Sequence, residues 1–536
     1  METLAGSLND TSTTRPLRSR EMRKVIWGAS LGTAFEWYDF FVYGALAAVL
    51  APLFFPPSMG QTAAFLASLA TFGVGLVLRP FGSLVFGRLG DLVGRKYTFL
   101  ITIVMMGIAT IGVGLLPTYA TAGAWAPALL VLLRCIQGLA LGGEYGGAAT
   151  YVAEHAEDGK RGQHTSWIQA TATVGFLLSL LVVTLTRYAT TAEQFNAWGW
   201  RIPFLFSVVL LGVSIYIRAK LNESPVFLQM KAEGKTSRQP IRDAFGNWAN
   251  LKYVLLALFG TVAGVTVLWY TGQFFALIFL MKWLKVEPTT AYMLVSVALL
   301  LGTPFFVLAG WMADRWGRKP VIVCGFIVGV LAVIPIFKGL THYANPALER
   351  AIATAPVTLE SSECRLRLFS GPENACERAR EQLNSAGVPY TLTPSDQPGA
   401  TVRVAGINAD GADTAAVARA LSQAGYPAQA NADEINRPMV VALIWLLVVI
   451  GCVVYGPNGA YLVELFPTKV RYSSMSMAYH IGTGYFGGFA LYFATLISTT
   501  TGNIYAGLYY PIVIAAISIA VTIFLLPETR NWKLNR

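Results

Sequence analysis

Charged residues are scarce in this chain of 536 residues. Asp, Glu, Lys and Arg make up only 13% of the sequence, whereas 54% of the residues are hydrophobic. Soluble domains carry about 25% charged residues, so the composition excludes an ordinary soluble protein and indicates a membrane protein. The four histidines and five cysteines form no cluster with metal-ligand spacing, and the Gly-x-x-x-x-Gly-Lys-Ser/Thr motif that binds nucleotide phosphates is missing. We therefore expect no enzyme chemistry, no metal, no cofactor and no direct use of ATP.

Long apolar runs fill most of the chain instead. Twelve runs have roughly twenty residues each, the length that crosses a bilayer, and they fall into two groups of six. We therefore expect an all-α membrane protein of twelve transmembrane helices in two six-helix halves, with a small α+β domain inserted in the second half. The expected division is a tail at 1–24, an N-terminal half at 25–218, a polar segment at 219–250, a C-terminal half at 251–340 and 438–526, an insert at 341–437, and a tail at 527–536.

The excess of basic residues, formally +11, follows the alternation of the loops. Lys and Arg gather at both ends of the chain and in alternate connections, whereas the loops near Pro56, Pro117 and Gly502 carry almost none. By the positive-inside rule both termini are cytoplasmic, and the insert at 341–437 lies outside the cytoplasm because nine helices precede it. The basic charge indicates contact with lipid headgroups, not with nucleic acid.

A ten-residue segment occurs twice, as GRLGDLVGRK at 87–96 and as GWMADRWGRK at 310–319. Each copy ends one apolar run and opens the next, and both keep the spacing Gly-x-x-x-Asp-x-x-Gly-Arg-Lys. Duplicated loops between matching pairs of apolar segments predict two homologous halves, an arrangement common in secondary transporters.

This repeated loop resembles the loop between the second and third helices of the major facilitator superfamily and its copy between the eighth and ninth. Further strings resemble the metabolite:proton symporter family of that superfamily: EWYDF at 36–40, RPFG at 79–82, RCIQG at 134–138, GWRIPF at 199–204 and ESP at 223–225. The resemblance covers nearly the whole chain. It implies a transporter of the bacterial inner membrane that imports a small polar metabolite by alternating access, with the proton as coupling ion.

The resemblance leaves the substrate open. It implies an organic acid, such as a di- or tricarboxylate, a 2-oxoacid or shikimate, or else a zwitterion such as betaine or proline. Buried arginines favour the organic acid. Two other functions stay as alternatives: a proton-coupled efflux antiporter, and a sensor or envelope-binding protein derived from a transporter, whose insert would bind an envelope partner.

The insert at 341–437 has its own pattern of strands and helices. Strands are expected at 364–370, 388–393 and 400–407, and amphipathic helices at 373–386 and 413–424. This order resembles a ferredoxin-like domain of about eighty residues, which would fold independently and be dispensable for the transport step. Cys364 and Cys376 lie in the insert, and an oxidising compartment allows them to form a disulfide; two unpaired thiols are the alternative.

Two carboxylates lie deep in the first apolar run. At 1.5 Å per residue, Glu36 and Asp39 are roughly 16 and 21 Å from its cytoplasmic end, and burying a charge there costs roughly 2.5 to 3.5 kcal/mol. Arg79 in the second run has a depth comparable to that of Glu36, so an ion pair with one carboxylate would leave the other free to carry a proton. The alternative is that these charges only tie helices together.

In the fourth run, Arg134 and Gln137 lie on one face of a helix, and a buried guanidinium can hold a carboxylate with two hydrogen bonds. Arg134 is therefore the candidate for binding an anionic substrate, or for pairing with the first-run carboxylates. Side chains that line the cavity in the family complete the expected substrate site, although each alone is also typical of packing: Tyr38, Tyr43, Gln169, Tyr270, Gln273, Tyr455 and Asn458.

A second set of charged residues lies at the cytoplasmic ends of the apolar runs. They come from the two repeated loops and from the ends of the fourth, fifth and tenth runs. We expect them to form contacts that close the cytoplasmic side when the outside is open. The expected gate residues are Asp91, Arg95, Glu144, Arg161, Asp314, Arg318, Glu464 and Arg471.

Overall fold

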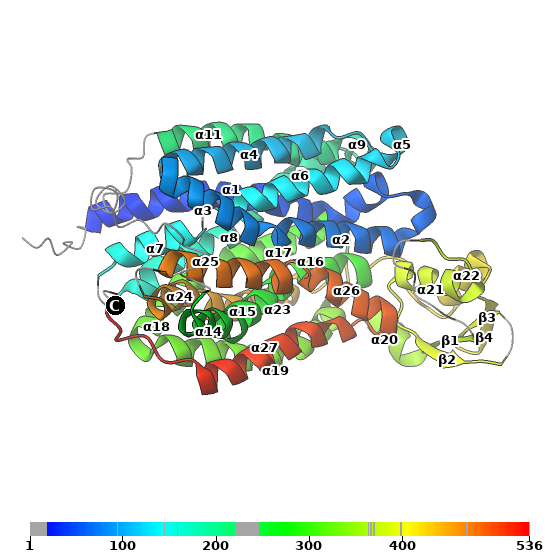
Figure 1. Ribbon diagram of the computed structural model, residues 1–536. Helices are drawn as coiled ribbons and strands as arrows, with labels where there is room; N and C mark the ends of the chain where they lie inside the picture. Colours follow the sequence, from blue (N-terminus) through cyan, green and yellow to red (C-terminus); the bar gives the residue numbers. More distant parts are fainter. Residues whose placement is uncertain are drawn as a thin grey trace, which may run out of the picture.

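The computed structural model describes residues 19–93, 95–143, 145–157, 159–219, 246–362, 364, 367, 370–396, 399–467 and 470–534. Long helices lie side by side along one axis, and the insert projects from one end of them (Figure 1). We call this end the insert end. At the opposite end, the terminal end, the first helix begins and the described chain stops (Figure 1).

The N-terminal half contains six spans, several of which are broken into two helices. The break between the second and third helices falls at Leu78, directly before Arg79 and Pro80. The elements are α1 (Ser19–Phe54), η1 (Pro57–Met59), α2 (Gln61–Val77), α3 (Arg79–Val93), α4 (Arg95–Leu115), α5 (Tyr119–Ala122), α6 (Trp125–Leu141), α7 (Tyr145–His155), α8 (Arg161–Ala189), α9 (Ala192–Ala197), η2 (Gly199–Arg201), α10 (Ile202–Leu205) and α11 (Ser207–Ala219).

The C-terminal half repeats this arrangement with more irregular helices. Its first span contains three π-helical turns, and Pro304 and Pro457 lie where two other spans break. The elements are α14 (Trp248–Ala257), η3 (Leu258–Val262), α15 (Ala263–Tyr270), η4 (Thr271–Phe275), α16 (Ala276–Ile278), η5 (Phe279–Trp283), α17 (Pro288–Gly302), α18 (Phe305–Trp316), α19 (Arg318–Ala344), α23 (Arg437–Tyr455), α24 (Asn458–Leu465), α25 (Arg471–Ile481), η6 (Gly482–Gly487), α26 (Ala490–Thr501), η7 (Ala506–Leu508) and α27 (Tyr509–Leu525).

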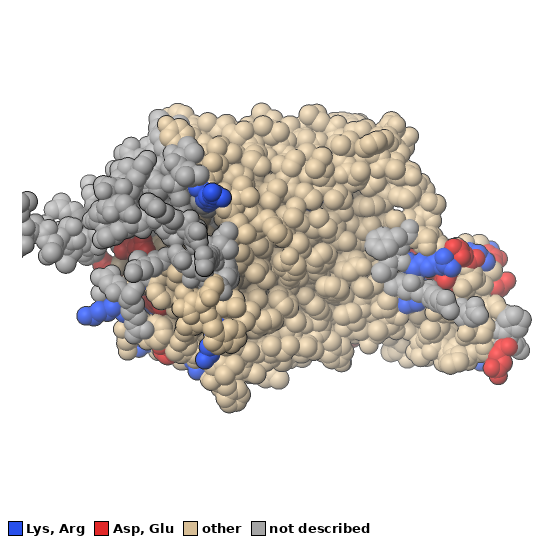
Figure 2. Space-filling model, viewed as in Figure 1, with Lys and Arg blue, Asp and Glu red and all other residues tan. Residues whose placement is uncertain are grey.

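Eleven helical segments among the described residues are long and apolar enough to cross a membrane, and the shorter apolar helix Trp125–Leu141 lies at the place of the expected fourth span. On the face shown in Figure 2, coloured charged side chains lie only near the two ends of the molecule, and the long middle is free of them. An uncharged belt between two charged ends is the surface that a bilayer requires. The expected all-α membrane fold is therefore confirmed.

The insert is α+β, as expected, but its strands differ from the sequence prediction. It consists of α20 (Pro346–Thr354), β1 (Val357–Ser361), α21 (Ala375–Ala386), β2 (Thr391–Pro394), β3 (Ala400–Val404), β4 (Ile407–Asp410) and α22 (Thr414–Gln423). The first described strand, β1, precedes Cys364, and most of the segment 364–370, which was predicted as a strand, lies outside the described residues. The segment 400–407, predicted as one strand, turns back at Ala405 and Gly406, which both have positive φ, so it forms a hairpin.

The ferredoxin-like prediction for the insert is wrong. The described sheet has the order β2-β1-β3-β4, in which β1 and β2 are parallel neighbours and β3 pairs antiparallel with the other edge of β1. A ferredoxin-like sheet places another strand between the first two, which makes a split βαβ unit. Here the βαβ unit is unsplit, because α21 returns the chain directly beside β1.

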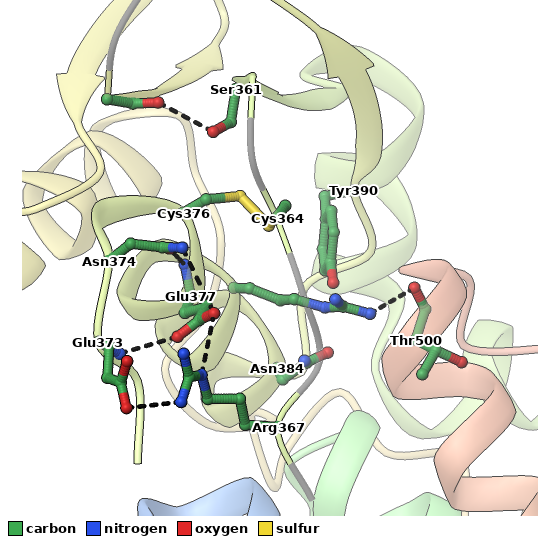
Figure 3. Close-up of a disulfide and its surroundings, with 12 residues drawn as sticks. Ser361, Cys364, Arg367, Glu373, Asn374, Cys376, Glu377, Asn384, Tyr390 and Thr500 are labelled. Atoms are coloured by element: carbon green, nitrogen blue, oxygen red, sulfur yellow. Dashed lines mark hydrogen bonds and ion pairs between the residues drawn. A yellow bond between two sulfur atoms is a disulfide. The ribbon is translucent and has the colours of Figure 1, made fainter. Parts of the chain in front are cut away.

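The structure joins Cys364 to Cys376 through a disulfide. Cys376 lies in the second position of α21 and is buried in the core of the insert with Leu359 and Leu383. Figure 3 shows this bond, with Glu377 on α21 reaching Arg367 and the main chain of Glu373 nearby. The disulfide ties the stretch after β1 to the start of α21.

Candidate functional site

Arg134, on α6, lies completely buried between helices of the N-terminal half. Its Nη1 donates to Gln137 Oε1 at 2.6 Å and to the carbonyl of Phe40 at 3.2 Å. The guanidinium lies over the rings of Phe40 and Tyr43, with centroids at 4.0 and 4.5 Å. Among the described residues, no carboxylate forms an ion pair with Arg134, so its charge is held by dipoles and aromatic faces.

The close packing around Arg134 explains the glycine in its motif. A Cβ on Gly138 would lie 1.7 Å from the carbonyl oxygen of Gly75 on α2, a distance that no side chain can occupy. Glycine therefore lets α2 and α6 touch through their backbones. This contact brings Phe72, on α2, within 5.3 Å of the Arg134 guanidinium.

Asp39 lies next to the cluster formed by Arg134, Gln137 and the rings around them, but its side chain forms a hydrogen bond with another helix. Ser207, at the start of α11, donates a short hydrogen bond to Asp39 Oδ1, and Gln137 Nε2 donates to the Asp39 carbonyl at 3.4 Å and to Thr110 at 2.7 Å. The hydroxyl of Tyr38 donates to the carbonyl of Pro203. Gln137 thus contacts both Arg134 and the backbone of Asp39.

Arg79 was expected to pair with one of the two carboxylates of the first helix, but among the described residues it forms no ion pair with Glu36 or Asp39. It is fully buried, and its Nη1 donates to Thr483 in η6 at 3.1 Å. Its guanidinium also lies over the rings of Trp37 and Tyr479, at 5.1 and 5.4 Å. Because Thr483 and Tyr479 belong to the C-terminal half, Arg79 connects the two halves instead of neutralising the first helix. Glu36 is buried as well.

Aromatic and amide side chains of the C-terminal half face this cluster. Gln273 Nε2 donates to Thr173 on α8 at 3.2 Å, and Trp269 Nε1 donates to the same hydroxyl at 3.3 Å. The rings of Phe176 and Phe274 stack with centroids 3.8 Å apart. The expected site residues of both halves therefore meet near the middle of the spans.

The remaining predicted site residues have varied surroundings. Tyr270 packs edge-on against Trp269, and the hydroxyls of Tyr455 and Tyr479 lie 2.5 Å apart. The side-chain amide of Asn458 is buried, and neither its nitrogen nor its oxygen has a hydrogen-bond partner among the residues that the structure describes. Buried polar atoms of this kind are usually satisfied, so Asn458 is suited to bind a ligand or water. Gln169 is buried beside Gly459.

A cavity of about 830 Å³ extends from the insert end towards this cluster. Its walls come from α1, α2, the segment from Leu277 to Pro288 and the insert. It reaches Gly44, the residue after Tyr43, where the rings of Phe72 and Phe274 pack closely. Aromatic side chains therefore separate the end of the cavity from Arg134.

The terminal end of the same helices is closed by charged contacts. Both carboxylate oxygens of Asp314 accept hydrogen bonds at 2.8 Å from the backbone N–H groups of Gly162 and Gln163, in the first turn of α8. Glu464 lies 2.9 Å from Arg318 and 3.9 Å from Arg161. Since α8 belongs to the N-terminal half and the other elements to the C-terminal half, these contacts join the two halves.

Further contacts complete this closure. Arg318 also pairs with Asp314 at 2.7 Å, and Arg471 pairs with Glu154 on α7 at 3.1 Å. Arg161 and Arg471 donate to carbonyls of Trp532 and Leu534 near the end of the chain. The structure thus brings Arg161, Asp314, Arg318, Glu464 and Arg471 together. Glu144 and the side chains of Asp91 and Arg95 lie outside the described residues.

Sequence reasoning missed the partners of these residues. Ser207, Thr483, Tyr479 and Thr173 are ordinary polar residues in apolar helices, and no motif marks them. Glu154 is different, because an acidic residue near the end of a span opposite a basic loop could have been recognised as a gate candidate.

Comparison with known proteins identifies relatives along much of the chain. Residues 25–252 match the family model described as "Sugar (and other) transporter". The shikimate transporter of Escherichia coli (strain K12) is 40% identical over 332 residues, which cover 59% of this chain and 72% of that protein. The proline/betaine transporter of Salmonella typhimurium is 38% identical over 329 residues, covering 59% of this chain and 64% of that protein.

The fold is also similar to a solved structure. The proton:xylose symporter XylE, a protein of the major facilitator superfamily, superposes with a TM-score of 0.63 at 18% identity, over 97% of this chain and 98% of that chain. At this identity the likeness concerns the fold alone.

Proposed function

The chain belongs to the major facilitator superfamily, and from this membership we propose that it is a proton-coupled symporter that imports a small organic acid by alternating access. It is an integral membrane transporter and not an enzyme, because its fold and its relatives are those of transporters. The observation that carries the proposal is Arg134, a buried guanidinium for which the described structure contains no carboxylate partner. A carboxylate of the substrate would supply that partner. The shikimate transporter, a relative, has an acid as its named substrate.

Asp39 is the proposed proton carrier. A buried carboxylate is costly when charged, and Ser207 gives it one hydrogen bond in the described structure. Gln137 contacts both Arg134 and the backbone of Asp39, so a substrate that pulls on Arg134 would also shift the surroundings of Asp39. Such a shared side chain would link substrate binding to protonation.

The proposed topology places the terminal end in the cytoplasm and the insert outside, in the inner membrane of a bacterium. The basic loops support this orientation. In this orientation the contacts of Asp314, Arg318 and Glu464 close the cytoplasmic side while the cavity opens to the outside. The described conformation would then be the outward-facing state of the transport cycle.

A zwitterionic osmolyte is the second candidate substrate, and the aromatic cluster favours it. Quaternary ammonium groups bind to aromatic faces, and Phe72, Trp269, Tyr270 and Phe274 form connected ring contacts. The named substrates of the proline/betaine transporter are zwitterions of this kind. Arg134 would hold the carboxylate of either substrate, so the rest of the molecule decides between them.

Counterflow in proteoliposomes tests both candidates. The vesicles are loaded in turn with 2-oxoglutarate, citrate, shikimate, glycine betaine or proline, and uptake of the same labelled compound is measured. We expect exchange of an acid, weakened about tenfold to a hundredfold by Arg134→Lys, because an ammonium cannot replace the two-point grip of a guanidinium.

Arg201→Lys is the matched control. Arg201 holds the carbonyls of Gly114 and Leu116 at 2.7 Å in the same half but lies outside the aromatic cluster, so this variant should exchange the acid with unchanged affinity. If only glycine betaine is exchanged, the substrate is the zwitterionic osmolyte and the proposed organic acid is wrong. Unaltered affinity in Arg134→Lys would remove Arg134 from the substrate site.

A further inference from the structure

Two lysines line the cavity that opens at the insert end, which we call the outer cavity. Lys282 is the penultimate residue of η5, and Lys285 lies two residues after the end of this helix. Of the described residues that line the cavity, these two are the only charged ones. The remaining walls are mostly apolar, and the insert contributes Ser385, Ala428 and Gln429. A cavity with two cations and no lining carboxylate attracts anions.

The ammonium group of Lys282 is available for a ligand. Within the described part of the chain, no hydrogen bond or ion pair holds it, and it lies 5.1 Å from the centroid of the Phe65 ring. The carboxylate of Glu381 on α21 is held elsewhere through one oxygen, Oε1, which accepts from the backbone N–H of Thr62 at 2.8 Å and from the Ser385 hydroxyl at 3.4 Å. Glu381 does not line the cavity.

Lys285 has a backbone conformation that lysine rarely adopts. Its φ is 54°, in the left-handed region where glycine or asparagine is usual. Its ammonium donates to the carbonyl of Ser385 in the insert, and its own carbonyl accepts from Ala430 in the insert at 3.0 Å. Glycine or asparagine would adopt this backbone conformation with less strain, which indicates that the lysine side chain has a function at this position.

We propose that Lys282 and Lys285 form an outer binding site for the carboxylate of an organic acid, at the mouth of the cavity and partly walled by the insert. An incoming acid would bind here first and then move past Gly44 towards Arg134. The site has room for a small acid, since the cavity volume is about 830 Å³. This inference rests on the proposed import of an organic acid, but its test does not.

Two thiol reagents of opposite charge measure the field of the lysines without any substrate. Ala48 is exposed and lines the cavity, so Ala48→Cys is introduced into the full chain after Cys135, Cys324 and Cys452 have been replaced by Ser. The probes are the anionic sulfonatoethyl methanethiosulfonate and the cationic trimethylammonioethyl methanethiosulfonate. Two charges roughly 10 Å from the thiol in water change the ratio of the two rates by about tenfold.

The lysines should give the anionic reagent an advantage, that is, a higher labelling rate than the cationic one. We expect this advantage to fall about tenfold when Lys282→Gln and Lys285→Asn are combined. Asparagine suits the left-handed backbone, which offsets the loss of the Lys285 hydrogen bond to Ser385, and Lys285→Arg should keep the advantage. The matched control is Lys338→Gln, since Lys338 is an exposed lysine on α19 that does not line the cavity; it should leave the ratio unchanged.

An unchanged ratio in both single variants and in their combination would overturn the outer site. If the ratio falls but no acid exchanges in counterflow with the native chain, the outer site stands and the proposed substrate class fails. If an acid does exchange, its KM should rise several-fold in the lysine variants while kcat is kept, because the loss concerns capture and not the transport step.

Discussion

Asp314→Asn should open the terminal end of the molecule. Asp314 accepts two backbone hydrogen bonds at 2.8 Å from the first turn of α8, across the boundary between the halves. A hydrogen bond to a charged group contributes about 1.5 to 3 kcal/mol, and a helix N-terminus adds roughly 0.3 to 1 kcal/mol for a negative charge. Asparagine keeps one acceptor oxygen but loses the charge and the second acceptor.

The expected loss is therefore about 2 kcal/mol, which corresponds to roughly a 30-fold shift of the equilibrium between the two conformations. Arg318 would keep Glu464 as its partner at 2.9 Å, so the variant leaves no unpaired buried arginine. The shift should favour the state that opens at the terminal end.

Cysteine labelling measures this shift. Ser166 on α8 is fully buried and packs against Gly310 of the other half, so Ser166→Cys should react only when the halves separate at the terminal end. In Asp314→Asn we expect its labelling rate to rise by roughly 30-fold, while labelling of Ala48→Cys from the insert end slows.

Glu528→Gln is the matched control. Glu528 accepts from the backbone N–H groups of Arg318 and Lys319 at 3.0 and 2.9 Å, which is the same chemistry at a helix N-terminus but within one half. It should lower the melting temperature without changing the labelling of Ser166→Cys. If Asp314→Asn behaves in the same way as this control, Asp314 stabilises the C-terminal half and has no gating role.

Two further predictions concern the proton and the outer site. Asp39→Asn should abolish uphill uptake driven by a pH gradient but spare counterflow, which need not release the proton; full uphill uptake would exclude Asp39 as the carrier. Burial lowers the pKa of Lys285 to about 8, so its charge is present below pH 8 and lost above it. The other charged groups near Lys285 in sequence or space are Lys282, Glu381 and Glu287. The ratio of the anionic to the cationic labelling rate at Ala48→Cys should fall as the pH rises from 7 to 9, and a ratio that does not change with pH would contradict this prediction.

The spans and most of the terminal-end contacts could be predicted from the sequence, because their signals are local. A run of twenty apolar residues marks a span wherever its partners lie, and the repeated Gly-x-x-x-Asp-x-x-Gly-Arg-Lys spacing marks the loop that holds Asp314 and Arg318. The glycine of that motif also has a visible cause: a Cβ on Gly310 would lie 2.4 Å from the carbonyl oxygen of Gly162.

The partners of the buried charges could not be predicted in the same way. Asp39 and Ser207 are 168 residues apart, and Arg79 and Thr483 are 404 apart. Depth along a helix fixes how far a side chain lies from the membrane surface, but not the direction in which it points. Arg79 therefore shared the depth of Glu36 yet turned to the other half. In the insert, β1 and the hairpin were missed because strands of four or five residues carry little pattern.

The insert, which was expected to be an independent domain, contacts both halves of the transporter. On α21, Glu381 accepts from the N–H of Thr62 in the N-terminal half at 2.8 Å, and its neighbour Arg380 donates to the carbonyl of Thr500 in the C-terminal half at 2.6 Å. Figure 3 shows Thr500 facing this part of the insert. Tyr390 adds a bond to the carbonyl of Thr499 at 3.2 Å.

A single helical turn cannot keep contacts on both halves if these halves rock apart or together at the insert end. Two charged hydrogen bonds contribute about 3 to 6 kcal/mol together, close to the roughly 5.5 kcal/mol that reverses a two-state equilibrium. We therefore expect Arg380→Gln combined with Glu381→Gln to fold and bind substrate but to raise the labelling of Ser166→Cys. Arg403→Gln, which removes an exposed pair with Glu360 inside the insert, should not. Equal labelling in both variants would mean that the insert only rests on the bundle and leaves the transport cycle unaffected.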